Sequence, residues 1–255
     1  MDSTRFQLDR APIIEAVLDI DCDLPPTLDW NDLKAAAREA FREAYPKARQ
    51  QYVQNHVLTA GEEGAPVLQF NEGLGALQFL TVDEKQLLQF RANGFSFNRL
   101  APYTTLNDYL GDIQTAWEKF RDLAGPVMVR KIGLRMINRI LLPMEGGKFK
   151  VSDYFTTAPR LPDTGMKLGI VGFLDQQVVA DEETGNLANI VKTSQLPEDD
   201  KLPVILDIDT YFLCQMPPPE WSELMPRIES LRNLKNRIFQ HTLTPQCLNL
   251  FSPSD

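Results

Sequence analysis

The tripeptide Leu-Gln-Phe occurs three times in the first half of the chain, beginning at Leu68, Leu77 and Leu88. Each copy lies in a short run of alternating apolar and polar residues, and Gly-rich or Asp-Glu-Lys segments separate the runs. Period two places Leu and Phe on one face of a strand and Gln on the other. We therefore expect an antiparallel meander of four strands, over 51–59, 66–72, 75–83 and 85–93.

The remaining segments divide into further strands and three helices. Alternation predicts strands over 11–22, 127–142, 166–180, 186–194 and 203–214, with a hairpin loop at 195–203. Apolar residues at helical spacing predict helices from Asp29 or Asn31 to about Tyr45, from Thr104 or Thr105 to Phe120, and over 219–243. Asp108 follows at capping-box distance from Thr105.

This order predicts an α+β fold, an antiparallel sheet packed on long helices. The first half reads β-α-β4-α, and a similar pattern restarts after Gly125-Pro126, where the irregular segment 143–165 stands in place of the first helix. We expect two pseudo-repeated halves, 1–125 and 126–255, that form one compact unit. The topology is similar to the TATA-binding-protein repeat and to helix-grip folds, an analogy that carries no function.

Charge and composition restrict the function classes. The net charge of −9 disfavours general nucleic-acid binding, because such a field repels phosphate backbones. No run approaches the roughly 18 apolar residues of a membrane span, and the N-terminus lacks a basic segment followed by an apolar one. We expect a cytoplasmic protein without membrane association, in which Cys22 and Cys214 are reduced core residues.

The strand over 127–142 carries a row of cations, Lys131, Arg135 and Arg139, on one face. One interpretation is a binding site for an anion, in which Gly133 leaves room for the ligand and arginine suits phosphate or carboxylate. The other is a set of cross-strand ion pairs with acids of the strand over 11–22, if the two strands are neighbours; those acids are Glu15, Asp19 and Asp21.

Two asparagines extend the candidate ligand-binding set. Asn138 lies on the opposite face of the same strand, and Asn236 lies between Leu234 and Ile238, close to the apolar stripe of the last helix. Asn236 is interpreted as a ligand contact or a buried polar anchor. The alternative is that this part of the helix, with Arg232, Lys235 and Arg237, is a solvated basic face.

Catalysis finds little support in the sequence. Asp207 and Asp209, added to the cations, suggest a metal-dependent phosphohydrolase, but the Glu-x-Glu-x-Lys strand of triphosphate tunnel enzymes is missing. The two histidines, His56 and His241, match no catalytic motif. His241 stands six residues before Cys247, a spacing at which a Cys–His dyad is geometrically conceivable. We predict no catalytic residue, no metal and no cofactor.

Three segments, RAPIIEAVLDI, GLRMINRI and LRNLKNRIFQHTLTPQCLNLF, resemble a sporadically distributed family of prokaryotic proteins of about this length. Met136 stands where an aromatic residue is expected. The resemblance implies an accessory gene of the kind found in defence or mobile-element neighbourhoods, and it brings no catalytic residue.

Three functions follow as hypotheses. The first is a non-enzymatic interaction protein that acts through a partner protein encoded nearby. The second is a receptor for a small anionic ligand, such as a nucleotide, on the concave face of the sheet. The third is the metal-dependent phosphohydrolase.

Overall fold

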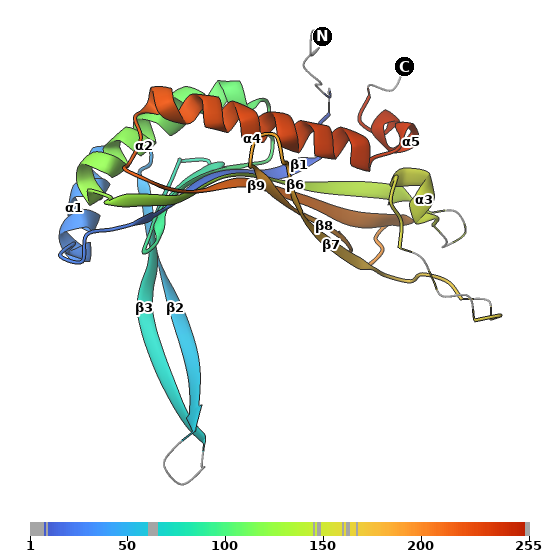
Figure 1. Ribbon diagram of the computed structural model, residues 1–255, viewed down its shortest axis with the longest axis horizontal. Coiled ribbons are helices and arrows are strands. Elements are labelled where there is room, and N and C mark those ends of the chain that lie inside the picture. Colours follow the sequence, from blue (N-terminus) through green and yellow to red (C-terminus); the bar gives the residue numbers. More distant parts are fainter. Residues whose placement is uncertain are drawn as a thin grey trace.

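In a computed structural model, the described residues are 8, 10–60, 66–144, 146, 149–159, 161, 164–166 and 168–252, of which 54–60 and 66–73 are described by their backbone alone. They form one antiparallel sheet in the order β2-β3-β4-β5-β1-β6-β9-β8-β7 (Figure 1). The strands are β1 (Ile13–Asp23), β2 (Lys47–Ala60), β3 (Pro66–Leu80), β4 (Gln86–Arg91), β5 (Gly94–Leu100), β6 (Met128–Pro143), β7 (Leu174–Ala180), β8 (Leu187–Ser194) and β9 (Lys201–Met216).

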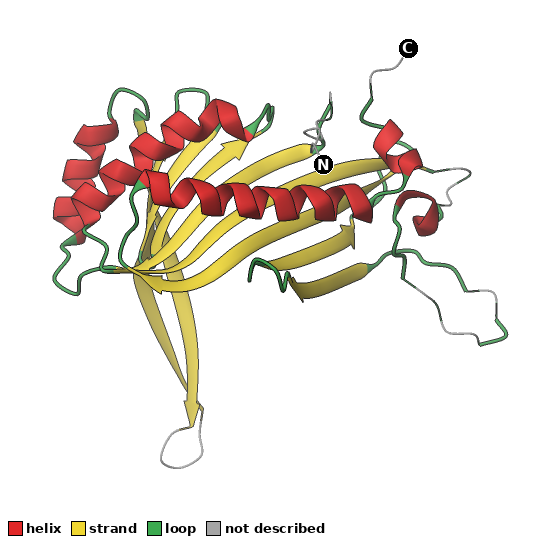
Figure 2. Ribbon diagram, turned by 45° about the horizontal axis from the view of Figure 1, so that its top comes forward, coloured by secondary structure: helices red, strands yellow, loops and turns green. Residues whose placement is uncertain are grey.

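The helices lie against one face of the sheet, and none of the described helices covers the other face, called the open face below (Figure 2). They are α1 (Trp30–Phe41), the 3-10 helix η1 (Leu106–Tyr109), α2 (Leu110–Ala124), α3 (Val151–Tyr154), α4 (Trp221–Thr242) and α5 (Pro245–Asn249). The α+β antiparallel prediction is therefore confirmed. None of the described helices combines the length and the apolar character that crossing a membrane would need.

The two halves of the chain share this sheet and meet at its centre. β1 pairs with β6, and the order outward is β5-β4-β3-β2 on one side and β9-β8-β7 on the other. Among the described residues, the second half has one strand fewer than the first. The short α3 lies in the segment that was expected to be irregular.

The meander forms as the Leu-Gln-Phe pattern predicts for its second and third copies. Leu77 pairs with Phe90 and Phe79 with Leu88, and all four side chains are buried. Gln78 points to the other face, where its Nε2 donates to Gln89 Oε1 at 2.9 Å. The side chains of the first copy lie outside the described residues.

Two strand predictions in this region need correction. Residues 66–72 and 75–80 belong to the single strand β3, because the segment with Gly73 and Gly75 continues the pairing with β2 instead of turning. Residues 81–83 lie in the turn between β3 and β4. Strand β5 was missed. It follows β4 through a two-residue turn, and Gly94 takes the positive φ of 141° that a side chain would oppose.

The predicted caps and apolar stripes of the helices are present. Asp29 Oδ1 accepts the backbone N–H of Asn31 at 2.7 Å, and Thr105 with Asp108 forms a capping box. The stripe of α2 is buried against β5 and α1. The short α5 was not predicted; Thr244 caps it through the N–H of Cys247.

The core consists of two clusters under different parts of α4. Leu224, Ile228 and Leu231 belong to the cluster that α1 and α2 share, whereas Phe239 and Leu243 belong to the cluster beside α3 and α5. Residues 232–237 of α4, between these two sets, belong to neither cluster. That interruption positions the site described next.

Candidate ligand pocket beneath helix α4

The cation row of β6 lies on the open face of the sheet, where carboxylates neutralise it. Lys131 Nζ lies 3.1 Å from Asp19 Oδ2 and 3.7 Å from Asp209 Oδ2. Arg135 donates to both oxygens of Asp207, with Nε at 2.9 Å from Oδ1 and 3.1 Å from Oδ2. Arg139 pairs with Glu198 in the β8–β9 loop.

The partners differ from those expected for Arg135 and Arg139. β6 lies between β1 and β9, and the acids of β9 and its loop reach these arginines first. The register places Glu15 opposite Ile137, and its carboxylate accepts from Asn98 Nδ2 at 2.7 Å. The remaining first-strand acid, Asp21, pairs with Arg91 of β4 at 2.8 Å.

Gly133 makes room for a protein carboxylate. A Cβ on Gly133 would collide with the Asp19 carboxylate and press on the stem of Lys131. The space that was interpreted as a ligand position is therefore filled by Asp19. Together these contacts form an ion-pair network, defined here as Asp19, Lys131, Asp209, Arg135 and Asp207.

The network is only partly hydrated, and pKa values shift accordingly. Burial alone would lower the pKa of Lys131, but the nearby Asp19 and Asp209 carboxylates outweigh it and raise that pKa. Burial raises the pKa of Asp209, and the neighbouring Asp19 adds to this shift. Asp209 Oδ1 is buried without a hydrogen-bond partner among the described residues.

A cavity of about 560 Å³ lies on the opposite face of the sheet, beneath the segment of α4 that belongs to neither core cluster. Its floor is Met136 and Asn138 of β6, and its roof is the segment Arg232–Gln240 of α4. The start of β1 and the loop before α2 close its sides, with Ala11, Pro12, Ile13, Tyr103, Thr104, Thr105, Leu106 and Asn107. Asn138 and Asn236 thus share a site from which Lys131, Arg135 and Arg139 are excluded.

Lys235 is the cation at the centre of the roof. It stands four residues after Leu231 and four before Phe239, the position at which a core side chain would complete the stripe. It lines the cavity and has no hydrogen bond or ion pair with any described residue. Burial, together with the charge of Arg232, lowers the pKa of Lys235 to about 8.

Asn138 presents an amide oxygen at the cavity floor. The residue is 1% exposed, and its Nδ2 donates to the Leu206 carbonyl at 2.9 Å and to the Met136 carbonyl at 3.3 Å. Those two bonds fix the amide, and no described donor reaches its Oδ1. Across the cavity, Asn236 makes no hydrogen bond with any described residue, so both amides can serve a ligand.

Arg232 is held in place at the rim. It donates to Asn107 Oδ1 at 2.8 Å, which ties α4 to the 3-10 helix η1, and to Glu229 at 3.3 Å. Glu229 is the one carboxylate in the described lining and is engaged by this pair. With Lys235 and the exposed Arg237, the lining carries more positive than negative charge within a chain of net charge −9.

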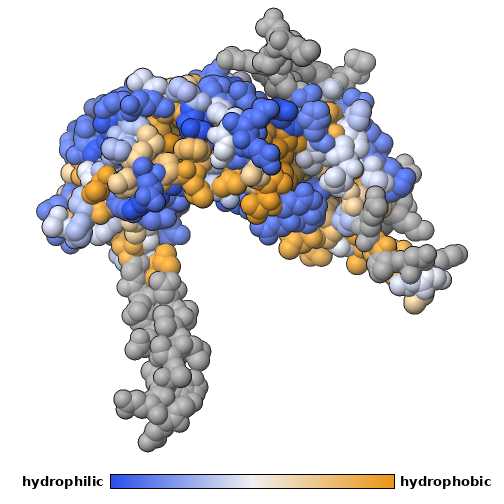
Figure 3. Space-filling view, viewed as in Figure 1, coloured by the Kyte–Doolittle hydropathy of each residue, from blue (hydrophilic) through white to orange (hydrophobic). Residues whose placement is uncertain are grey.

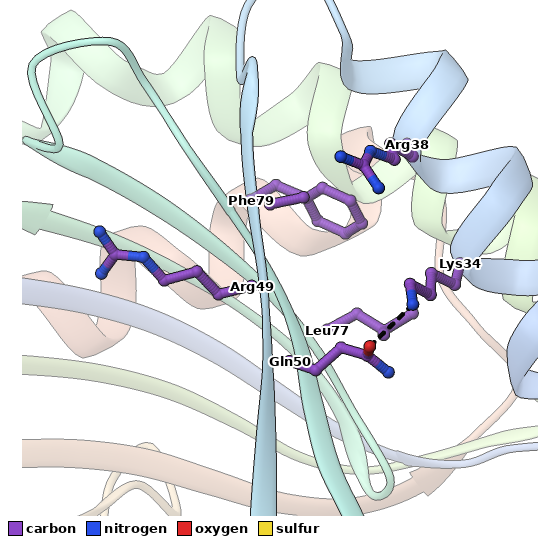
Figure 4. Close-up of a pocket in the computed structure, with 7 residues that line it drawn as sticks. Lys34, Arg38, Arg49, Gln50, Leu77 and Phe79 are labelled. Carbon is purple, nitrogen blue, oxygen red and sulfur yellow. Dashed lines mark hydrogen bonds between the residues drawn. The ribbon is translucent and has the colours of Figure 1, made fainter.

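A second cavity, between α1 and β2, is much smaller, at about 110 Å³ (Figure 4). Lys34 crosses it to donate to Gln50 Oε1 at 2.7 Å. Arg49 points away from α1 in the same view and pairs with Glu84. This cleft is too small to hold a nucleotide, so the cavity beneath α4 is the stronger candidate.

Groups suited to metal binding or nucleophilic catalysis do not converge in the described part of the chain. No set of three His, Cys, Asp or Glu residues there could hold a metal ion. Asp207 and Asp209 face Arg135 and Lys131 instead. Burial raises the pKa of the Cys247 thiol to about 12, which opposes thiolate formation, and the side chain of His56 lies outside the described residues.

Neither the protein-family models nor the curated proteins contain a match to this chain.

Proposed function

We propose that this protein is a receptor for a small anionic ligand, such as a nucleotide, that binds beneath α4. The observation that carries the proposal is the unpaired Lys235 ammonium, which occupies a core-facing position yet borders a cavity of about 560 Å³. Lys235 is partly buried, and a partly desolvated cation without a counter-ion is unfavourable. A bound anion would remove that penalty, so we expect the charged group of the ligand to lie beside the Lys235 ammonium.

The other walls suit the rest of a nucleotide. Asn233 and Asn236 can donate to and accept from a base edge, and Asn138 can accept through its Oδ1. Tyr103 with Ile13 offers apolar surface. The cavity volume lies within the roughly 300–1,000 Å³ of typical small-molecule sites. The single carboxylate of the described lining is engaged with Arg232, which favours binding over acid–base catalysis.

Replacing Lys235 by methionine tests the site directly. We expect nucleotides to raise the melting temperature of the unmodified protein, and the variant to lose at least about tenfold in affinity, because a buried charge-assisted contact is worth about 1.5–3 kcal/mol. Isothermal titration calorimetry with a panel of mononucleotides measures the loss. Lys150→Met is the matched control, since Lys150 is exposed and lies outside the cavity. Equal affinities for both variants would contradict the proposal.

The affinity should also depend on pH. An anion needs the protonated form of Lys235, whose pKa of about 8 lies below its usual value. Affinity should therefore be nearly constant below pH 7 and fall by up to about tenfold per unit as the pH rises above 8. The Lys235→Met variant should lack this fall. An unmodified protein whose affinity is flat from pH 7 to 9 would argue against Lys235 as the contact.

A protein partner stays a prediction of the sequence and is the second candidate. The observation that favours it is the β2–β3 hairpin, which projects from the sheet (Figure 1), with Tyr52 55% and Val53 43% exposed near its base. Co-purification with the product of a neighbouring gene would test it, and a pair that separates on gel filtration would speak against it.

A further inference from the structure

The sheet has two edges, and they differ in how far they are protected from pairing. Edge strands in natural proteins carry charges, prolines or bulges that prevent edge-to-edge association. At one edge, the described part of β2 carries Lys47 and Arg49, both paired with Glu84 at 2.8 Å, and its ladder is bulged at Gln51/Tyr52. The strand at the other edge, β7, has no lysine, arginine or proline in its sequence LDQQVVA.

The one charge on β7 is already neutralised inside the protein. Asp175 lies 2.7 Å from Lys192 Nζ, and the Lys192 side chain is 4% exposed. The same ammonium donates to the carbonyl and hydroxyl of Thr157, so the pair is anchored on the helix-covered side. β7 therefore offers a neutral edge, although the whole chain is acidic.

The backbone groups on the outer side of β7 can be identified from its pairing with β8. Ser194 N–H donates to the Phe173 carbonyl at one end and Asp181 N–H to the Asn186 carbonyl at the other. Hydrogen-bonded pairs alternate along an antiparallel ladder. Residues 173, 175, 177, 179 and 181 therefore bond to β8, and the N–H and C=O groups of Leu174, Gln176, Val178 and Ala180 point outward.

The same residues put apolar side chains on the open face of the sheet. Leu174 is 70% exposed and Val178 63% exposed, with Gln176 between them. Figure 3 shows apolar surface at this end of the molecule, where β7 lies in Figure 1. Backbone pairing capacity and exposed apolar side chains thus coincide on one strand.

We propose that β7 pairs with β7 of a second copy of this chain, antiparallel about Gln176, so that two sheets join into one. In this register Leu174 lies opposite Val178 of the copy, Gln176 opposite Gln176, and Asp175 opposite Gln177. Every outward-pointing backbone group in this span then meets an outward-pointing partner. Apolar side chains meet apolar side chains, and no two like charges face each other.

The side chains that lie opposite each other match better in this register than when the centre moves to Gln177 or Val178. Shifting the centre to Gln177 places Leu174 opposite Ala180 and Val178 opposite Gln176, which separates the two apolar pairs. Shifting it to Val178 places Leu174 opposite Glu182. A closed, isologous pair about Gln176 covers the β7 edge of both copies at once. The edges that remain are the two β2 strands, whose described part is charged and bulged.

The mass in solution and a register-specific disulfide test the proposal. We expect light scattering to approach twice the 28.9 kDa of one chain as concentration rises, and Val178→Lys to return the protein to a single chain. Val82→Lys is the matched control, because Val82 is 71% exposed in the turn between β3 and β4. A Val178→Lys variant with undiminished dimer, or an unmodified protein of single-chain mass at every concentration, would overturn the proposal.

Cysteines report the register without weakening the pairing. Gln176→Cys should form a disulfide-linked dimer on mild oxidation, since Cα atoms of a hydrogen-bonded antiparallel pair lie about 5.5 Å apart, within disulfide range. Gln177→Cys should not, because Gln177 faces Asp175 of the copy in this register. Equal cross-linking of both variants, or of Gln177→Cys alone, would exclude pairing about Gln176.

Discussion

Replacing Trp117 by alanine is expected to lower the free energy of unfolding by about 4 kcal/mol, which is within the range for truncating a buried aromatic side chain. The Trp117 side chain is fully buried in α2, with ring centroids 5.7 Å from Phe120 and 6.0 Å from Phe95. Alanine would leave a cavity in the centre of the larger core cluster. Urea unfolding followed by circular dichroism measures the loss.

Trp117 also stabilises the fold through a hydrogen bond of its indole. Its Nε1 donates to the Pro219 carbonyl at 3.1 Å, just before α4 begins, and Arg121 donates to the same carbonyl at 3.3 Å. The indole therefore links α2 to the residues just before α4. Truncation removes this bond, so α4 loses one of the contacts that set its place over the sheet.

Trp117→Phe separates the packing from this hydrogen bond. It keeps most of the packing but leaves the Pro219 carbonyl with only the Arg121 bond, so we expect a loss of about 1–2 kcal/mol. Replacing Tyr52, an exposed aromatic residue, by alanine is the control and should change stability by less than about 0.5 kcal/mol. A Trp117→Ala variant as stable as the Tyr52→Ala variant would contradict the assigned core.

The strands and helices that follow a local rule could be predicted from the sequence. Thr105 and Asp108 cap their helix as their spacing requires, and Leu77 with Phe79 faces the core as alternation requires. Strand β5 was missed although Asn93-Gly94, a favoured hairpin dipeptide, lies where the turn Ala92-Asn93 meets the strand. A two-residue turn leaves no polar loop by which two strands can be separated.

The partners of the cations could not be predicted in the same way. Acids stand at suitable spacing on both β1 and β9, and which of them meets Arg135 depends on the strand order and register across the sheet. Sequence reasoning found Asn138 and Asn236 as polar residues near apolar stripes. Lys235 was placed only on a solvated basic face, although its spacing of four from Leu231 and from Phe239 was the available signal that it faces inward.

Replacing Lys131 by methionine should cost about 3 kcal/mol of stability at pH 7, because it leaves the carboxylates of Asp19 and Asp209 without the cation between them. The two carboxylates have side chains only 13% and 21% exposed, so water replaces little of the lost attraction. The anion-site interpretation predicts the opposite, since removing a free cation from a site would leave stability nearly unchanged. Chemical unfolding at pH 7 decides between them.

The pH dependence of that loss follows from the direction of the pKa shift. Burial and the neighbouring Asp19 already raise the pKa of Asp209 above its unfolded value, and loss of Lys131 raises it further. A raised carboxyl pKa means that the folded state binds the proton more tightly, so the penalty is full at neutral pH and shrinks as the pH falls. The stability gap between the unmodified protein and Lys131→Met should therefore narrow between pH 7 and pH 4.

Asp209→Asn provides the matched second variant, because it removes the charge and nearly keeps the shape. Alone it should have a small effect, since Asp209 Oδ1 has no hydrogen-bond partner among the described residues to lose. Combined with Lys131→Met it should restore part of the lost stability, because a single carboxylate, Asp19, then remains beside the missing cation and Arg91 lies 4.0 Å from it. A double variant no more stable than Lys131→Met, with a gap that does not change with pH, would mean that Lys131 acts through the packing of its stem and not through its charge.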